Sequence, residues 1–211
     1  MKHHQDSKQA IIRAGREMLA ITSLSDLSVR RLVEHARVNH GLFHYYFKTK
    51  EKFYAEVVKD LFDSFNATAS GSPVQYKDPV EQLRALLIGF ALFLRENWGL
   101  LWPVLKDNQL RDLMRNSIRD HLKPHMEALR RTVKACRERK MLVVESDTEI
   151  LNMLFLFSVG PIILHGLGTE IMPNMMKEYP IVLDRETIST EAIYKRIDMA
   201  LKRVLKVRSR R

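Results

Sequence analysis

The chain has 211 residues, 45% of them hydrophobic and 28% charged, with a formal net charge of +10. This composition is ordinary for a globular protein that is long enough to bury a sizeable core. Its single cysteine, Cys136, excludes an internal disulfide and a cysteine-based metal cage. The polar start MKHHQDSKQ has no apolar run of the kind that a signal peptide needs. We therefore expect a cytoplasmic protein.

The positive charge is concentrated at the two ends of the sequence. Residues 1–52 contain ten Lys or Arg against five Asp or Glu, and five of the eight histidines. The last seventeen residues contain eight Lys or Arg against one Asp. Net charge alone is a weak argument for nucleic acid, but two basic ends favour it.

Glycine (8) and proline (7) are sparse, while good helix formers are plentiful. We find no internal repeat and no strand-like alternation longer than a few residues. The composition therefore predicts an all-α fold, with about nine helices along the chain.

The first expected helix starts at a cap, Asp6 or Ser7, and runs to about Ile21. Two short helices follow, at 29–35 and 39–47, with Ser28 as the N-cap of the first of them. Phe43 and Phe47, four residues apart, give the second short helix an apolar stripe.

The middle of the chain is predicted from its caps. Thr49 caps a helix over 50–68, and residues 69–77 form a linker. Asp78, Pro79 and Glu81 then start a helix that runs to about Asn97. We expect Trp98, Trp102 and Pro103 to interrupt the helical pattern, a short helix to end at Met114, and a long helix to continue to about Arg139 with a kink at Pro124.

The last third contains an uncharged segment, 150–169, that opens with a capping box of Ser146 and Glu149. We expect a bend at 160–161, a stop at Gly166 or Gly168, and a loop over 170–183. Ser189 or Thr190 caps a final amphipathic helix. The purely apolar runs are shorter than the roughly 20 residues of a membrane span, so we predict a buried interface helix and no membrane.

The outward face of the segment 39–47 is unusually rich in aromatic and hydrogen-bonding side chains: His40, Leu42, His44, Tyr45 and Tyr46. One interpretation is a surface helix whose aromatics pack on the following helix. The favoured interpretation is a recognition helix, because such side chains can bond phosphates and base edges in the major groove of DNA. Ser28, Arg30 and Lys50 lie at helix starts, where they can add phosphate contacts.

Residues 9–54 resemble the DNA-binding domain of the tetracycline-repressor (TetR) family of bacterial regulators. The resemblance rests on Ile11-Ile12-x-Ala14, Met18-Leu19, Ser28-Val29-Arg30-x-Leu32-Val33, Ala36-x-Val38-x-x-Gly41-x-Phe43 and Tyr46-Phe47-x-Thr49-Lys50-Glu51. It implies an N-terminal three-helix helix-turn-helix domain at 1–50 and a larger effector-binding and dimerisation domain at 51–211. It also implies a homodimer on a near-palindromic double-stranded operator.

Carried over by position, the family's DNA contacts fall on Arg30, Leu42, His44, Tyr45, Tyr46 and Lys50, to which we add Ser28, Asn39 and His40. The chain departs from the family at Arg37, where glycine is usual, at 39–42, where Ser-Lys-Gly-Thr is usual, and at His44, where tyrosine is usual. The departures leave the operator sequence open. Because histidine changes charge near neutrality, we also expect His40 and His44 to make operator affinity depend on pH.

The interior of the second domain offers aromatic and methionine side chains at the end of one helix and along its neighbours. Each alone is more simply explained as core. Together they suggest an adaptable cavity for a lipophilic small molecule, without a cofactor or metal. The predicted ligand-binding residues are Phe90, Phe93, Asn97, Trp98, Trp102, His121, Met126, Met153 and Phe157, with Phe155, His125 and His165 as further candidates.

The family resemblance places the dimer interface on the helices at 147–166 and 189–207. The uncharged stretch supports this, because so apolar a surface is a liability in a monomer. The alternative interpretation is packing within one chain.

Two other function classes stay open. An enzyme is disfavoured, since HExxH, GxSxG, GxGxxG and P-loop patterns are all missing from the sequence. A DNA-architectural protein would bind through its basic tail without sequence preference. Deleting residues 206–211 would then abolish binding, whereas in a specific regulator it only weakens the salt-dependent, non-specific contribution.

Overall fold

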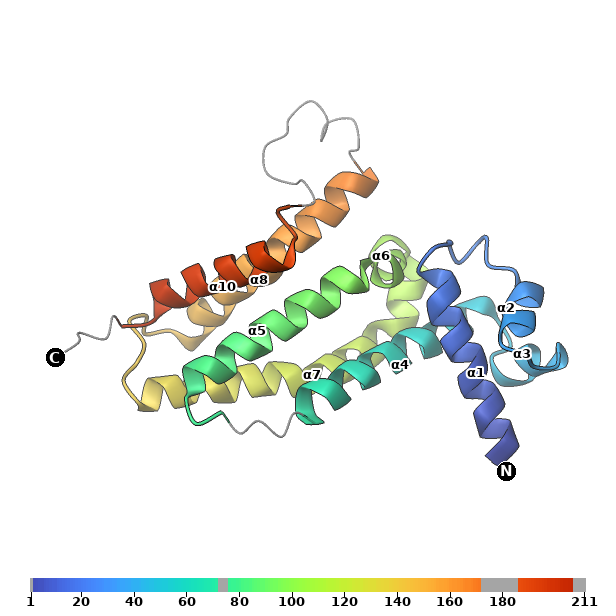
Figure 1. Cartoon of the computed structure of the whole chain (residues 1–211), viewed down its shortest axis with the longest axis horizontal. Coiled ribbons are helices and arrows are strands. Elements are labelled where there is room, and N and C mark those ends of the chain that lie inside the picture. Colours follow the sequence, from blue (N-terminus) through green and yellow to red (C-terminus); the bar gives the residue numbers. More distant parts are fainter. Residues whose placement is uncertain (1, 72–75, 172–185, 207–211) are drawn as a thin grey trace. The chain divides into compact units, whose positions relative to one another are not determined.

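The computed structural model describes residues 2–71, 76–171 and 186–206 (Figure 1). Within these ranges it contains nine helices and no strand, with one isolated bridge between Leu142 and Leu205. The predicted all-α class is confirmed. The expected loop at 170–183 lies almost entirely outside the described residues.

The chain forms two compact units, and its helices α4 (Lys50–Gly71) and α7 (Asn108–Glu138) contribute to both. The first unit consists of residues 1–67 and 97–122, and the second of residues 68–96 and 123–211. Each unit is described in turn.

Three helices open the first unit. Helix α1 spans Lys2–Leu19, α2 spans Val29–His35 and α3 spans Gly41–Tyr46. The prediction for α2 and its cap is confirmed: Ser28 Oγ accepts the N–H of Arg31 at 3.3 Å. Helix α3 is shorter than predicted, because Asn39 precedes it and its side-chain oxygen accepts the N–H of Gly41 at 2.9 Å.

The expected start of α1 at Asp6 or Ser7 is wrong, since the helix already begins at Lys2. No glycine or proline stands among residues 2–5 to prevent helical backbone there. Ser7 and Asp6 therefore lie inside the helix, although both residue types favour caps.

An aromatic core holds α1, α3 and α4 together. Phe43, Phe47 and Phe53 have ring centroids 5.0–5.4 Å apart, and all three are buried. Gly15 of α1 packs directly on Phe53 and lies close to Val57, leaving no room for a β-carbon. The stripe of Phe43 and Phe47 is thus core, as predicted, and it fixes which face of α3 points outward.

Helix α4 spans Lys50–Gly71 and starts at the predicted cap, where Thr49 Oγ1 accepts the N–H of Lys52 at 3.3 Å. Two ion pairs join it to α1: Lys8 with Glu56 at 2.7 Å, and Arg16 with Asp60 at 3.2 Å. These contacts couple α4 to the three N-terminal helices.

Two predictions for the middle of the chain are wrong. Residues expected to interrupt the pattern form helix α6, Trp98–Lys106, because Leu100, Leu101 and Val104 recur at helical spacing and are buried. The short and long helices expected after it are one helix, α7, Asn108–Glu138. Asp107 caps it, accepting the N–H groups of Gln109 and Leu110 at 2.7 and 3.0 Å.

In the second unit, α5 (Pro79–Glu96), α8 (Asp147–Ile171) and α10 (Thr190–Val204) pack against one another (Figure 1). Their predicted caps are confirmed: side-chain oxygens of Asp78, Ser146 and Ser189 accept backbone N–H groups at the three starts, at 3.0–3.2 Å. Arg84 of α5 forms two hydrogen bonds, of 2.6 and 3.1 Å, with Asp198 of α10.

The expected stop of α8 at Gly166 or Gly168 is wrong, since the helix continues to Ile171. Both glycines are buried, and there an unbroken helix keeps the backbone groups hydrogen-bonded. Among the described residues, α8 is also the one single helix that is long and apolar enough to cross a membrane, over Asp147–Thr169. Only a third of its most apolar stretch is buried inside the chain.

Candidate nucleic-acid interface and effector site

Helix α3 presents two different faces. Phe43 lies in the core, while Tyr45 is 64% exposed and His40 and His44 are exposed. Leu42 and Tyr46 are half-buried at the edges of this outward face. The predicted recognition residues therefore lie on one surface of the first unit, with the aromatic core behind them. Large, rigid aromatic rings over a packed core are held in place at little cost in side-chain entropy.

The turn between α2 and α3 is tight and contains a strained residue. Arg37 has a φ of 55°, in the left-handed region that glycine adopts without strain. The N–H groups of Arg37 and Val38 return to the carbonyls of Glu34 and Val33, at 3.1 and 3.0 Å. The position usually held by glycine is thus occupied by an exposed cation.

Three of the predicted phosphate-binding residues make contacts within the chain. Arg30 Nε lies 2.9 Å from a carboxylate oxygen of Glu34, and Lys50 Nζ donates to the carbonyl of Ser25 at 3.2 Å. Ser28 Oγ is occupied as a cap. Exposed pairs of this kind contribute only about 0.2–1 kcal/mol, so a phosphate can compete for the same donors.

Lys48 is a further cation at this surface that sequence reasoning did not select. Its Nζ lies 5.9 Å from the centroid of the Tyr45 ring, and its φ of 68° turns the chain between α3 and α4. The signal available in the sequence was a lysine three residues after an exposed tyrosine. The contact orients both the ring and the amine toward the same surface.

The predicted ligand-binding residues divide between the two units. Phe90, Phe93, Met126, Met153 and Phe157 belong to the second unit, whereas Asn97, Trp98, Trp102 and His121 belong to the first.

In the first unit, Trp98 and Trp102 stack with centroids 5.8 Å apart. The buried Nε1 of Trp98 has no hydrogen-bond partner within the described part of the chain. His121 joins α7 to α4: its Nε2 lies 3.0 Å from Asp63 Oδ1 and its Nδ1 lies 2.6 Å from the carbonyl of Ser117. His121 therefore has a structural contact of its own.

In the second unit, the structure brings together an aromatic cluster around Phe90. Its ring stacks on His125 at 4.8 Å and on Phe93 at 6.2 Å, and Phe155 approaches at 6.5 Å. His125 is 4% exposed, and burial lowers the pKa of its imidazole to about 4. Met126 and Met153 are half-buried, whereas Phe157 is on the surface. His125 and Phe155 are thus central to a cluster in which they were only secondary candidates.

A broad apolar face lies along α8 and α10. Its exposed members, with exposed fractions between 36% and 65%, are Phe155, Leu156, Phe157, Leu164, Tyr194 and Met199. The opposite sides of these helices pack within the second unit through Leu154, Ile193 and Ile197. The two helices are therefore apolar on two sides, which is the pattern of a surface that becomes buried on association.

Comparison with known proteins agrees with this geometry. Residues 11–57, which include α2 and α3, match the model of the family described as bacterial regulatory proteins, tetR family. No curated protein matches the sequence.

Among solved structures, the chain is similar to a transcriptional regulator from Saccharomonospora viridis in complex with choline, with a TM-score of 0.75, 12% identity and coverage of 96% of this chain and 100% of that one. It is similar to a TetR transcription regulator from Haloarcula marismortui (TM-score 0.66, 16% identity, 96% and 100% covered). It is also similar to SmeT, the repressor of the multidrug efflux pump SmeDEF of Stenotrophomonas maltophilia (TM-score 0.63, 19% identity, 95% and 93% covered).

Proposed function

We propose that the chain is a regulator of the tetR family: a cytoplasmic, homodimeric repressor that releases a near-palindromic operator when it binds a lipophilic effector. The fold and the matched domain support a DNA-binding transcriptional regulator. The operator, the effector and the direction of the response belong to the proposal.

The observation that carries the proposal is the two-faced helix α3. Phe43 and Phe47 anchor it to the core, and Tyr45, His40 and His44 face outward. In the family's mode of binding this outward face enters the major groove, where Tyr hydroxyls and His ring nitrogens bond base edges and phosphates. The same unit supplies positive charge for the phosphate backbone of DNA, from Arg30, Arg37, Lys48 and Lys50.

Two copies of α3 require a dimer. The exposed apolar face of α8 and α10 supplies a self-complementary surface for a two-fold interface. In such a dimer the two recognition helices occupy successive major grooves, about 34–36 Å apart or somewhat more.

For the effector, we propose the aromatic cluster around Phe90 in the second unit. Two solved structures of similar fold contain small molecules: the S. viridis regulator is a complex with choline, and SmeT has been solved with triclosan. In this chain the cluster contains only aromatic rings and a neutral imidazole, which suits a lipophilic compound better than a charged one.

Helix α7 offers a route from effector to DNA. It carries His125 in the aromatic cluster and, four residues earlier, His121, which pairs with Asp63 of α4. Helix α4 in turn is joined to α1 by two ion pairs. We expect α4 to have two positions, one in which the spacing of the two recognition helices matches the operator and one in which it does not. An effector releases DNA only if its affinity is higher for the second state.

The first experiment is selection of bound sequences from random double-stranded DNA by the full-length protein. We expect enrichment of an inverted repeat with half-sites about one helical turn apart. If no sequence is enriched, or if the enriched sequence lacks two-fold symmetry, the proposed near-palindromic operator is wrong.

The second experiment replaces Tyr45 by Ala and measures affinity for the selected operator and for unrelated DNA. We expect a loss of roughly 1–3 kcal/mol per half-site on the operator alone. Tyr76→Ala, at another exposed tyrosine outside the predicted interface, is the matched control and should change neither affinity. Equal affinities of the two variants for the operator would take Tyr45 out of the interface.

A further inference from the structure

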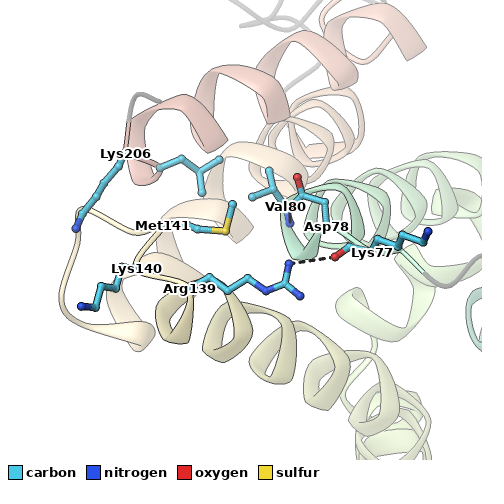
Figure 2. Close-up of a pocket in the computed structure, with 8 residues that line it drawn as sticks. Lys77, Asp78, Val80, Arg139, Lys140, Met141 and Lys206 are labelled. Atoms are coloured by element: carbon cyan, nitrogen blue, oxygen red, sulfur yellow. Dashed lines mark hydrogen bonds between the residues drawn. The ribbon is translucent and has the colours of Figure 1, made fainter. Parts of the chain in front are cut away.

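A hollow of about 610 Å³ lies entirely in the second unit, where α5 begins and where α7 and α10 end (Figure 2). It shares no residue with the aromatic cluster around Phe90. Its lining residues are Lys77, Asp78, Val80, Arg139, Lys140, Met141, Leu205 and Lys206.

Backbone contacts between distant segments hold the walls in place. The N–H of Lys206 donates to the carbonyl of Met141 at 2.8 Å, and the N–H of Val143 donates to the carbonyl of Val204 at 2.9 Å. Across the hollow, Arg139 Nη1 donates to the carbonyl of Lys77 at 3.0 Å, as the dashed line in Figure 2 marks. Because these bonds join three segments far apart in the sequence, the hollow is preformed.

The end of α7 is shaped so that its cations reach the hollow. Lys140 has a φ of 54°, and the N–H of Met141 returns to the carbonyl of Cys136 at 3.0 Å. This left-handed ending normally uses glycine. Here the position holds a lysine, whose exposed side chain lines the hollow beside Met141 and Lys206 (Figure 2).

The lining is strongly unbalanced in charge. Four side chains are cationic (Lys77, Arg139, Lys140 and Lys206) and one, Asp78, is anionic, with its Oδ1 already accepting the N–H of Val80. Within the described residues, none of the four cations forms an ion pair with a carboxylate. Four positive charges against one negative charge leave a net repulsion among the cations, and an anion with two charges relieves it.

The remaining lining is apolar. Val80, Met141 and Leu205 are half-buried and separate the cations from the interior of the unit. A ligand that satisfies both parts has a compact anionic group and a non-polar body. A phosphate monoester fits the anionic part best, because it bears nearly two negative charges at neutral pH and three acceptor oxygens.

We propose that this hollow binds small organic phosphates, with the phosphate between the lysine and arginine side chains and the non-polar body against Met141. The site goes beyond the proposed operator and effector sites, and its occupancy does not require DNA.

The test uses phenyl phosphate as the probe and the full-length protein labelled with ¹³C at the methionine methyl groups. The Met141 resonance is assigned from its loss in Met141→Leu. We expect titration with phenyl phosphate to shift this resonance saturably, inorganic phosphate to bind more weakly, and benzyl alcohol, which lacks the charge, to leave it unmoved. Benzoate separates the chemistries: binding as tight as that of phenyl phosphate would replace a phosphate site by a carboxylate site and so overturn the proposal as stated.

Two matched double variants locate the interaction. Lys140→Gln with Lys206→Gln removes two lining cations, which follow the ends of α7 and α10, whereas Lys134→Gln with Lys202→Gln removes two exposed cations within these helices and outside the lining. We expect the first pair to raise the Kd for phenyl phosphate at least tenfold and the second to change it less than twofold. Equal Kd values in the two double variants, or a saturable shift of other methionines with Met141 unmoved, would overturn the proposal. Operator binding, measured in parallel, is expected to be intact in both, so failure here is distinct from failure of the regulator function.

Discussion

The face of α3 and the face of α8 and α10 are both more aromatic or apolar than an ordinary solvent-exposed surface, but in different ways. Helix α3 exposes Tyr45 with histidines around it, whereas α8 and α10 expose Leu156, Leu164 and Met199. The first set keeps a polar atom on each large ring and suits a wet, charged partner such as DNA. The second has few polar atoms and gains only by excluding water, so it suits another protein surface. The difference separates the proposed nucleic-acid interface from the proposed subunit interface within one chain.

The largest effect is expected from breaking the apolar face. Leu156 is 65% exposed, so Leu156→Asp costs little in the isolated chain but places a charge in the proposed subunit interface. We expect the dimer to dissociate to monomers at micromolar concentration and operator affinity to fall at least a hundredfold. Analytical ultracentrifugation and operator titration measure the two effects.

Leu113→Asp is the control for this variant, because Leu113 is 47% exposed but belongs to the first unit, outside the α8 and α10 face. It should remain dimeric with normal operator affinity. A dimeric Leu156→Asp protein would mean that the apolar face has another partner.

The next prediction concerns the aromatic cluster that lies beside this face. Burial lowers the pKa of His125 to about 4, so the folded protein keeps it neutral while the unfolded chain takes up a proton near pH 6.5. Stability should therefore fall as the pH falls from about 6.5 to 4, by up to about 3 kcal/mol from this residue. Urea unfolding of the wild type and of His125→Phe between these pH values measures the difference.

The outcome separates His125 from the other titrating groups, which both proteins share. If burial is the cause, His125→Phe should lose less stability toward low pH than the wild type, and at neutral pH the two should differ little. Parallel curves would mean that His125 is solvated or protonated in the folded protein.

The helix packing behind α3 can be tested with two glycines of opposite expected behaviour. A β-carbon on Gly15 would overlap Phe53 and lie 3.1 Å from Val57 Cγ2, whereas one on Gly89 of α5 would meet nothing within 4 Å. We expect Gly15→Ala to destabilise the protein by roughly 1–3 kcal/mol through overpacking. Gly89→Ala should instead stabilise it by about 0.5–1 kcal/mol, the helix preference of alanine over glycine.

Thermal or urea unfolding of the two variants gives the signs directly. Stabilisation by Gly15→Ala would show that α1 packs less tightly against Phe53 than in the structure. The core that supports α3 would then also be less tightly packed.

What the sequence could predict depends on whether a feature is determined by neighbouring residues or by distant segments. Helix starts at Ser28, Thr49, Asp78 and Ser189 are determined within three residues, and all four predictions are confirmed. The continuation of α8 through its two glycines depends on burial by distant segments, which no local pattern contains.

The candidate sites follow the same division. The outward face of α3 follows from the four-residue spacing of Phe43 and Phe47, and the structure agrees. The division of the predicted ligand residues between two units, and the central place of His125, arise from long-range packing. The pairing of Arg30 with Glu34 was within reach, since the two residues are four apart on one helix.

The smallest effect on stability is expected at Arg37, in the turn before α3. Its left-handed backbone costs about 1–2 kcal/mol relative to glycine, and the greater freedom of unfolded glycine offsets part of the gain. Arg37→Gly should therefore stabilise the protein by roughly 0.5–1 kcal/mol.

If the exposed guanidinium contacts a phosphate, the same variant binds the operator less tightly and with a salt dependence lower by about one counterion per half-site. Arg31→Gly, at an exposed helical position in α2, is the control and should destabilise by up to about 1 kcal/mol. A gain in stability together with an unchanged salt dependence would assign Arg37 to the turn alone, and the strain at this position would then have no compensating contact with DNA.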